Sequence, residues 1–126
     1  ETCWDTAGSQ IELNACAGKG TDATRMEMEK VLAKIALAYK SEPSFLKHIE
    51  RSQKAWMNWM YLEVEAHYPP DKTGFYPWGT VRPMCQLGLQ SQFIMKRIRD
   101  LKAWLEPSDR EEGEVCGGIY QTYTRP

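Results

Sequence analysis

The chain has 126 residues, of which 42% are hydrophobic and 26% are charged, and its formal net charge is −1. This length predicts one domain, residues 1–126, that is large enough to bury a core. The near-equal numbers of basic and acidic residues, 16 and 17, argue against nucleic-acid binding, which usually needs a basic excess, and against adhesion to anionic membranes. No apolar run approaches the roughly 20 residues of a membrane-spanning helix, so we expect no membrane insertion.

The four cysteines, Cys3, Cys16, Cys85 and Cys116, are widely spaced and form no CxxC pair. Because the chain also has only two histidines, this spacing argues against a zinc site. An even cysteine count favours two disulfides in an oxidising compartment, and a first residue other than Met is expected of a processed or trimmed chain. The alternative is a cytosolic protein with four buried free thiols, and non-reducing mass spectrometry distinguishes the two.

The first helical segment follows Ser9, which is a typical N-cap residue. We predict a short helix over residues 10–17 that closes at Gly18 and Gly20, because glycine readily takes the left-handed conformation that ends helices.

A second helix is predicted from a cap at Thr21 or Asp22. It should stop near Ser41, because Pro43 disfavours helical geometry in the residue before it. Apolar residues recur at helical spacing between these limits, namely Met28, Val31, Leu32, Ile35 and Tyr39.

A third, long amphipathic helix is predicted after Pro43, with Ser44 as its cap. Its stripe consists of Leu46, Ile49, Gln53, Trp56, Met60 and Val64. Trp56 lies within the stripe and is predicted to be a core residue, whereas Trp59 lies nearer its edge.

Residues 67–83, "HYPPDKTGFYPWGTVRP", interrupt the helical pattern with four prolines and two glycines. A loop of this length inside a compact domain is uncommon and is often functional. Its rings, Tyr68, Phe75, Tyr76 and Trp78, have two interpretations that stay open here. They either fold back over the bundle as a satellite core or form a binding surface.

Helical spacing resumes with Leu87, Ile94, Ile98, Leu101 and Leu105, and Pro107 ends this last helix. The predicted fold class is therefore all-α, an irregular bundle of three main helices plus a short N-terminal helix. Residues 106–126 form an acidic tail that Cys116 would tie down if it is bridged. A like-charge run of this kind is more often a solvated segment than a binding site.

Catalytic groups are scarce in this sequence. His48 and His67 are the only imidazoles, and neither belongs to a Ser/His/Asp or Cys/His motif. Glu63 and Glu65 lie two apart on a helix and point to different sides. We therefore predict a protein that is not an enzyme and uses no cofactor.

Several stretches together resemble one known family. They are "CWDTAGSQIELNACA" at the start, "QKAW" at 53–56, "WGTVRPM" at 78–84, and then Arg97 and Leu101. In this order and spacing they are similar to the LprI-type lysozyme inhibitor family, a set of small secreted or lipid-anchored bacterial proteins. The resemblance covers about residues 3–105.

The chain departs from the family pattern at one cysteine pair, where Val64 and Leu89 stand instead. The resemblance then implies that Cys85 and Cys116 form a substitute pair, which leaves Cys3 with Cys16. Four cysteines allow three pairings.

The resemblance implies a periplasmic or secreted inhibitor that occludes the active site of a cell-wall-degrading enzyme. Its partner would be lysozyme or a cell-wall-targeting bacterial effector. The candidate partner-binding residues are Tyr68, Phe75, Tyr76, Trp78 and Arg82 in the loop and Asp109, Glu111, Glu112 and Glu114 in the tail. Two other hypotheses are an immunity protein that neutralises a muramidase, amidase or lipase from a rival bacterium, and a structural or envelope-stress protein with no enzyme target.

Overall fold

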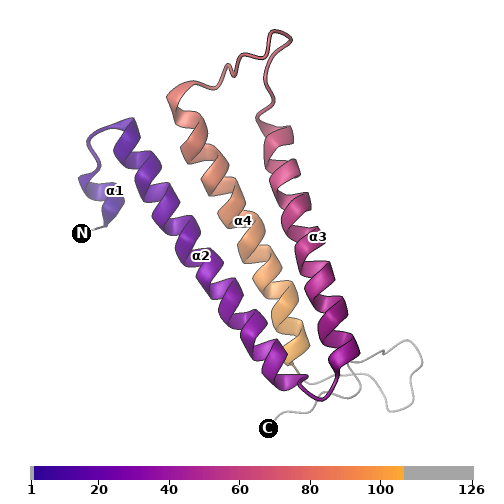
Figure 1. The fold of residues 1–126 in the computed structure, drawn as a ribbon. Helices are drawn as coiled ribbons and strands as arrows, with labels where there is room; N and C mark the ends of the chain where they lie inside the picture. Colours follow the sequence, from indigo (N-terminus) through magenta and orange to yellow (C-terminus); the bar gives the residue numbers. More distant parts are fainter. Residues whose placement is uncertain (1, 107–126) are drawn as a thin grey trace.

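The computed structural model describes residues 2–106, which form a bundle of three long helices with a short helix at one end (Figure 1). The elements in chain order are α1 (Cys3–Thr6), α2 (Gln10–Ala38), α3 (Pro43–His67), the 3-10 turn η1 (Gly79–Val81), α4 (Arg82–Lys102) and the 3-10 turn η2 (Ala103–Leu105). In Figure 1, α4 lies between α2 and α3. The described residues contain no strand, so the all-α prediction is confirmed for this part of the chain.

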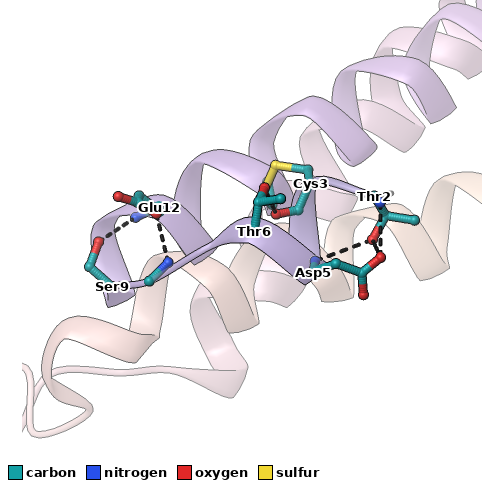
Figure 2. Close-up of a disulfide and its surroundings, with 8 residues drawn as sticks. Thr2, Cys3, Asp5, Thr6, Ser9 and Glu12 are labelled. Atoms are coloured by element: carbon teal, nitrogen blue, oxygen red, sulfur yellow. Dashed lines mark hydrogen bonds between the residues drawn. A yellow bond between two sulfur atoms is a disulfide. The ribbon is translucent and has the colours of Figure 1, made fainter.

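The short N-terminal helix lies earlier than predicted. It is α1, which begins with a capping box in which Thr2 Oγ1 accepts from the Asp5 amide at 3.3 Å and Asp5 Oδ2 accepts from the Thr2 amide at 2.9 Å (Figure 2). The predicted Cys3–Cys16 disulfide is confirmed; its Cα atoms are 5.7 Å apart, and it joins α1 to the second turn of α2.

The predicted break at Gly18 and Gly20 is wrong, because α2 continues through both glycines to Ala38. Thr21 is not a cap. Its side chain is buried, and its hydroxyl donates a hydrogen bond that is shared by the carbonyl oxygens of Ala17 and Leu87, each 2.9 Å away. A Cβ at Gly18 would lie 4.0 Å from Leu87 Cδ1, an ordinary van der Waals distance, so α4 lies against this part of α2. That packing outweighs the roughly 1 kcal/mol by which each helical glycine is less favourable than alanine.

The third helix begins at Pro43 itself, so the predicted cap at Ser44 is wrong. Glu42 occupies the cap position and makes no side-chain cap bond. Proline suits the first helical position because its missing N–H would have had no partner there and its φ is preset. Along α3, Trp56 packs half-buried against the core, as predicted, and Trp59 at the edge of the stripe is 46% exposed.

The core is built from the three predicted stripes, one from each long helix. Its buried members are Met28, Val31 and Ile35 of α2, Tyr39 at the end of α2, Met60 of α3, and Ile94 and Leu101 of α4. Tyr39 also donates its hydroxyl to the carbonyl oxygen of Trp104 at 2.7 Å, which satisfies the polar end of a buried ring.

The segment between α3 and α4 is shorter than the predicted loop over 67–83. Regular structure stops at His67 and resumes with η1, and Arg82 and Pro83 already belong to the first turn of α4. Proline is tolerated there for the same reason as in α3. The segment connects the ends of α3 and α4 on the side of the bundle where α2 begins (Figure 1).

Candidate functional site

The loop of residues 68–78 is shaped by one carboxylate. Asp71 Oδ1 accepts hydrogen bonds from the Thr73 hydroxyl at 2.6 Å, the Thr73 amide at 2.8 Å and the Phe75 amide at 3.0 Å. The Asp71 amide donates in return to the Phe75 carbonyl at 2.7 Å, and Gly74 takes the positive φ of 85° that this turn requires. The hydrogen bonds from Thr73 and Phe75 hold the pKa of Asp71 below its ordinary value. The loop is therefore folded on itself before any partner arrives.

The base of the loop is closed by Trp78. Its indole N–H donates to the carbonyl oxygen of Pro69 at 3.1 Å, and its ring meets Tyr68 edge-on with the ring centres 5.8 Å apart. Partial burial raises the pKa of the Tyr68 phenol, and the neighbouring thiol of Cys85 adds to this increase. Tyr68 and Trp78 thus join the end of α3 to the beginning of α4.

The outer surface of the loop is aromatic and cationic. Phe75 is 65% exposed, Tyr76 is 44% exposed and Trp78 is 40% exposed. The guanidinium carbon of Arg82 lies 4.0 Å from the centre of the Tyr76 ring, a cation–π geometry. Phe75, Tyr76 and Trp78 are therefore exposed, whereas the fourth ring of the loop, Tyr68, is half-buried. Four of the predicted residues therefore lie on or beside one exposed surface.

The first turns of α2 hold this surface in place. Asn14 Nδ2 donates to the carbonyl oxygen of Thr80 at 3.1 Å, and Gln10 Nε2 donates to Asn14 Oδ1 at 2.9 Å and contacts Met84 Sδ at 3.7 Å. Gln10 and Asn14 belong to the opening motif, and Thr80 and Met84 belong to "WGTVRPM". Two motifs that are far apart in the sequence therefore meet at the base of the loop.

A second surface, which the sequence analysis missed, is a groove of about 310 Å³ between α3 and α4. We call it the α3–α4 groove. It is lined by Trp56, Trp59, Phe93, Lys96, Arg97 and Asp100. The rings of Trp59 and Phe93 meet edge-on with centres 5.3 Å apart. The available signal was the position of Trp59 at the edge of its stripe, but the sequence did not reveal which residues of α4 faced it.

Arg97 is the polar centre of the groove. Its Nε donates to Gln53 Oε1 at 3.0 Å, and its guanidinium carbon lies 5.6 Å from the Trp56 ring centre. Burial lowers the pKa of Arg97, and nearby Asp100 partly opposes this change. The Nη2 atom is buried and has no hydrogen-bond partner among residues 2–106. The "QKAW" motif and Arg97, which carried part of the family resemblance, are therefore in direct contact.

The remaining predicted site residues lie beyond the described part of the chain. The acidic residues Asp109, Glu111, Glu112 and Glu114 fall outside residues 2–106, and so does Cys116. Cys85 is half-buried and forms no disulfide with a described residue, so its pairing with Cys116 stays a prediction.

Neither histidine is paired with a carboxylate within the described range. His48 Nδ1 lies 2.8 Å from the carbonyl oxygen of Ser44, and His67 ends α3 beside Tyr68. No group of three or more His, Cys, Asp or Glu side chains in residues 2–106 is arranged to hold a metal ion. None of the helices there is both long and apolar enough to cross a bilayer.

The fold and its two exposed surfaces define a small, disulfide-pinned helical protein whose prominent features are suited to binding another molecule. Residues 3–101 match the family model described as lysozyme inhibitor LprI, and the chain belongs to this family. Family membership implies a lysozyme-inhibitor-like function, and members are extracellular or periplasmic inhibitors. No curated protein and no solved structure matches the chain.

Proposed function

We propose that this protein binds a cell-wall-degrading enzyme and blocks it by inserting the loop of residues 68–78 into the active-site cleft. The observation that carries this proposal is the exposure of Phe75, Tyr76 and Trp78 on a loop that Asp71 already holds folded. A preorganised loop binds more tightly because little conformational entropy remains to be lost on association.

The chemistry of the loop suits such a cleft. Glycoside hydrolases of the lysozyme type work with two carboxyl groups. The loop carries the cation Lys72, and Arg82 of α4 lies over the Tyr76 ring. Aromatic residues and arginine are also the side chains that most often dominate binding energy at protein interfaces. Insertion would exclude the polysaccharide, and the chain would perform no reaction of its own.

The direct test is inhibition of lysozyme and of bacterial muramidases by the wild-type protein and by Phe75→Ala. Phe75 is the most exposed ring of the loop, so its loss should weaken inhibition by about 2 kcal/mol, or roughly 30-fold, with no change in thermal stability. Leu37→Ala is the matched control, because Leu37 is 70% exposed at the far end of α2. Equal inhibition by wild type and Phe75→Ala would contradict insertion of the loop. Wild-type protein that inhibits none of these enzymes would favour the structural or envelope-stress hypothesis.

A dedicated immunity protein is the second candidate, and one observation favours it. Shortly after the Ala-Trp pair of "QKAW", α3 carries three exposed apolar side chains. Trp59 is 46% exposed, Tyr61 39% and the following Leu62 56%. Trp59 and Leu62 lie three residues apart, on one side of the helix, and exposed apolar side chains that group in this way suit one cognate partner. Tight binding of a single bacterial effector together with indifference to hen-type lysozyme would support immunity over general inhibition.

A further inference from the structure

The α3–α4 groove contains a guanidinium whose direction is fixed by its neighbours. Arg97 Nε donates to Gln53 Oε1 at 3.0 Å, and the guanidinium carbon lies 5.6 Å from the centre of the Trp56 ring. Gln53 is held on its other side as well, because its Nε2 donates to Met28 Sδ of α2 at 3.4 Å. Residues of three helices thus position Arg97, and little side-chain entropy remains to be lost when a ligand binds to it.

One donor of this guanidinium is left over. Arg97 Nη2 is buried and has no hydrogen-bond partner among residues 2–106. A buried donor is rarely left unpaired in proteins, because the free energy lost on its desolvation is not recovered. Asp100, which also lines the groove, acts on Arg97 electrostatically but makes no hydrogen bond to Nη2. The donor therefore calls for an acceptor from outside these residues.

The charges of the groove favour a monovalent anion as that acceptor. Lys96 and Arg97 supply two positive charges and Asp100 supplies one negative charge, so the lining has a net charge of +1. A carboxylate carries a single negative charge, and its hydrogen bonds with arginine are among the strongest in proteins. A phosphate monoester is closer to a dianion at neutral pH and would be matched less well.

The walls of the groove favour a flat apolar body beside the carboxylate. The rings of Trp59 and Phe93 meet edge-on with their centres 5.3 Å apart, and Trp59 is 46% exposed. The volume of about 310 Å³ falls at the lower end of the roughly 300–1,000 Å³ that is usual for small-molecule sites. A single ring or a short branched chain would therefore cover these side chains.

We propose that the α3–α4 groove binds a small carboxylate with a flat apolar body, of the aromatic-acid class. The carboxylate accepts a hydrogen bond from Arg97 Nη2 with Lys96 beside it, and the apolar body lies against Trp59 and Phe93. Trp59 precedes Tyr68 by nine residues, or roughly 14 Å along α3 at 1.5 Å per residue. The site is therefore separate from the loop of residues 68–78, and its test requires no enzyme target.

The first experiment compares phenylacetate with phenylacetamide, which has nearly the same shape and no charge. Each is titrated into the isotope-labelled full chain, and the Arg97 Nε–H and Trp59 indole N–H signals are followed by NMR. Phenylacetate should shift both signals in a saturable way and should bind roughly tenfold more tightly than the amide. The absence of a saturable shift, or equal affinity for the two compounds, would overturn the proposal.

The second experiment removes the charges one at a time. Arg97→Gln should weaken phenylacetate binding roughly tenfold, whereas Arg99→Gln, at an exposed position of the same helix, should bind like the wild type. Lys96→Gln changes an exposed residue, so it keeps the fold even where Arg97→Gln does not, and it should weaken binding several-fold. Lys34→Gln on α2 is its matched control. Wild-type affinity in Lys96→Gln or in a folded Arg97→Gln would overturn the proposal.

Two further variants test the rest of the lining. Asp100→Asn removes the negative charge of the groove and should strengthen phenylacetate binding several-fold. Trp59→Ala removes a wall and should weaken it several-fold, whereas Trp4→Ala changes a ring of similar exposure on α1 and should not. Weaker binding by Asp100→Asn, or equal binding by the two tryptophan variants, would contradict this placement of the ligand. A dimer that Trp59→Ala dissociates and phenylacetate leaves intact would assign the groove to a second copy of the chain and overturn the proposal.

Discussion

The two sides of α4 differ in how closely they meet their neighbours. Toward α2, the contact is made by small residues such as Gly18 and Thr21, and the Thr21 hydroxyl reaches the Leu87 backbone. Toward α3, large side chains such as Trp59 and Phe93 meet edge-on and leave a groove. Small residues allow two helices to pack tightly with satisfied polar groups, whereas large half-exposed rings leave space for another segment. The α2 side therefore serves stability and the α3 side is available for binding.

The largest expected effect is on the core that both sides share. Ile94 of α4 is fully buried, so Ile94→Ala should lower the free energy of unfolding by about 2–5 kcal/mol through lost burial and a new cavity. Urea denaturation measures this change. The neighbouring Met95 is 51% exposed, and Met95→Ala should change stability by about 0.5 kcal/mol or less. Similar losses of stability for both variants would mean that α4 does not bury Ile94 in the core while exposing Met95.

The α2 side is tested by Thr21→Val, which keeps the side-chain shape and removes the hydroxyl. We expect a loss of about 1–2 kcal/mol, because the link between α2 and the Leu87 carbonyl disappears from a buried position. Thr24→Val is the matched control, since the Thr24 hydroxyl donates only to Gly20 of its own helix. Thermal unfolding of the two variants should separate by several degrees, and coinciding curves would contradict a role for the link.

A smaller effect of opposite sign is expected at Gly20. This glycine lies inside α2 and nothing lies within 4 Å of an added Cβ, so Gly20→Ala should raise the free energy of unfolding by about 0.5–1 kcal/mol. Gly74→Ala should instead destabilise the loop, because Gly74 has a φ of 85°. Destabilisation by Gly20→Ala would indicate that the helix is broken there after all.

The smallest expected effect is local and depends on pH. The pKa of Asp71 is lowered in the folded loop. The ionised carboxylate therefore stabilises the loop above the ordinary carboxyl pKa, and this stabilisation is lost as pH falls through the pKa of the folded state. The protection factors of the Thr73 and Phe75 amides, which are exchange rates corrected for the intrinsic effect of pH, should therefore fall as pH drops below the ordinary carboxyl pKa, while the helices stay folded. Asp71→Asn does not titrate and should remove this pH dependence. A wild-type loop whose exchange shows no such acid dependence would contradict the role of the carboxylate.

Much of the fold could be predicted from local patterns. The stripes of α2, α3 and α4 are properties of spacing along the chain, so they identified Ile35, Met60 and Ile94 as core positions. The resemblance implied the Cys3–Cys16 pair that the structure contains. The loop was predicted from its prolines, glycines and aromatic residues. Composition does not specify which side chains face the solvent, so the exposure of the rings could not be predicted.

The failures concern residues whose role depends on a distant partner. Gly18 and Gly20 looked like a helix end because glycine often ends helices, yet α2 continues through both and packs against α4 at Gly18 and Thr21. The α3–α4 groove was not predicted because it requires knowing which residues of α4 face Trp59.

The sequence by itself therefore determined three amphipathic helices and an aromatic connection, because periodicity and composition are local, and the family resemblance added the N-terminal bridge. Only the tertiary structure decided that Thr21 links two helices and that Gln53 holds Arg97 beside a groove. These contacts join residues 66 and 44 positions apart. A contact across such distances depends on how the helices pack, and no local pattern specifies that.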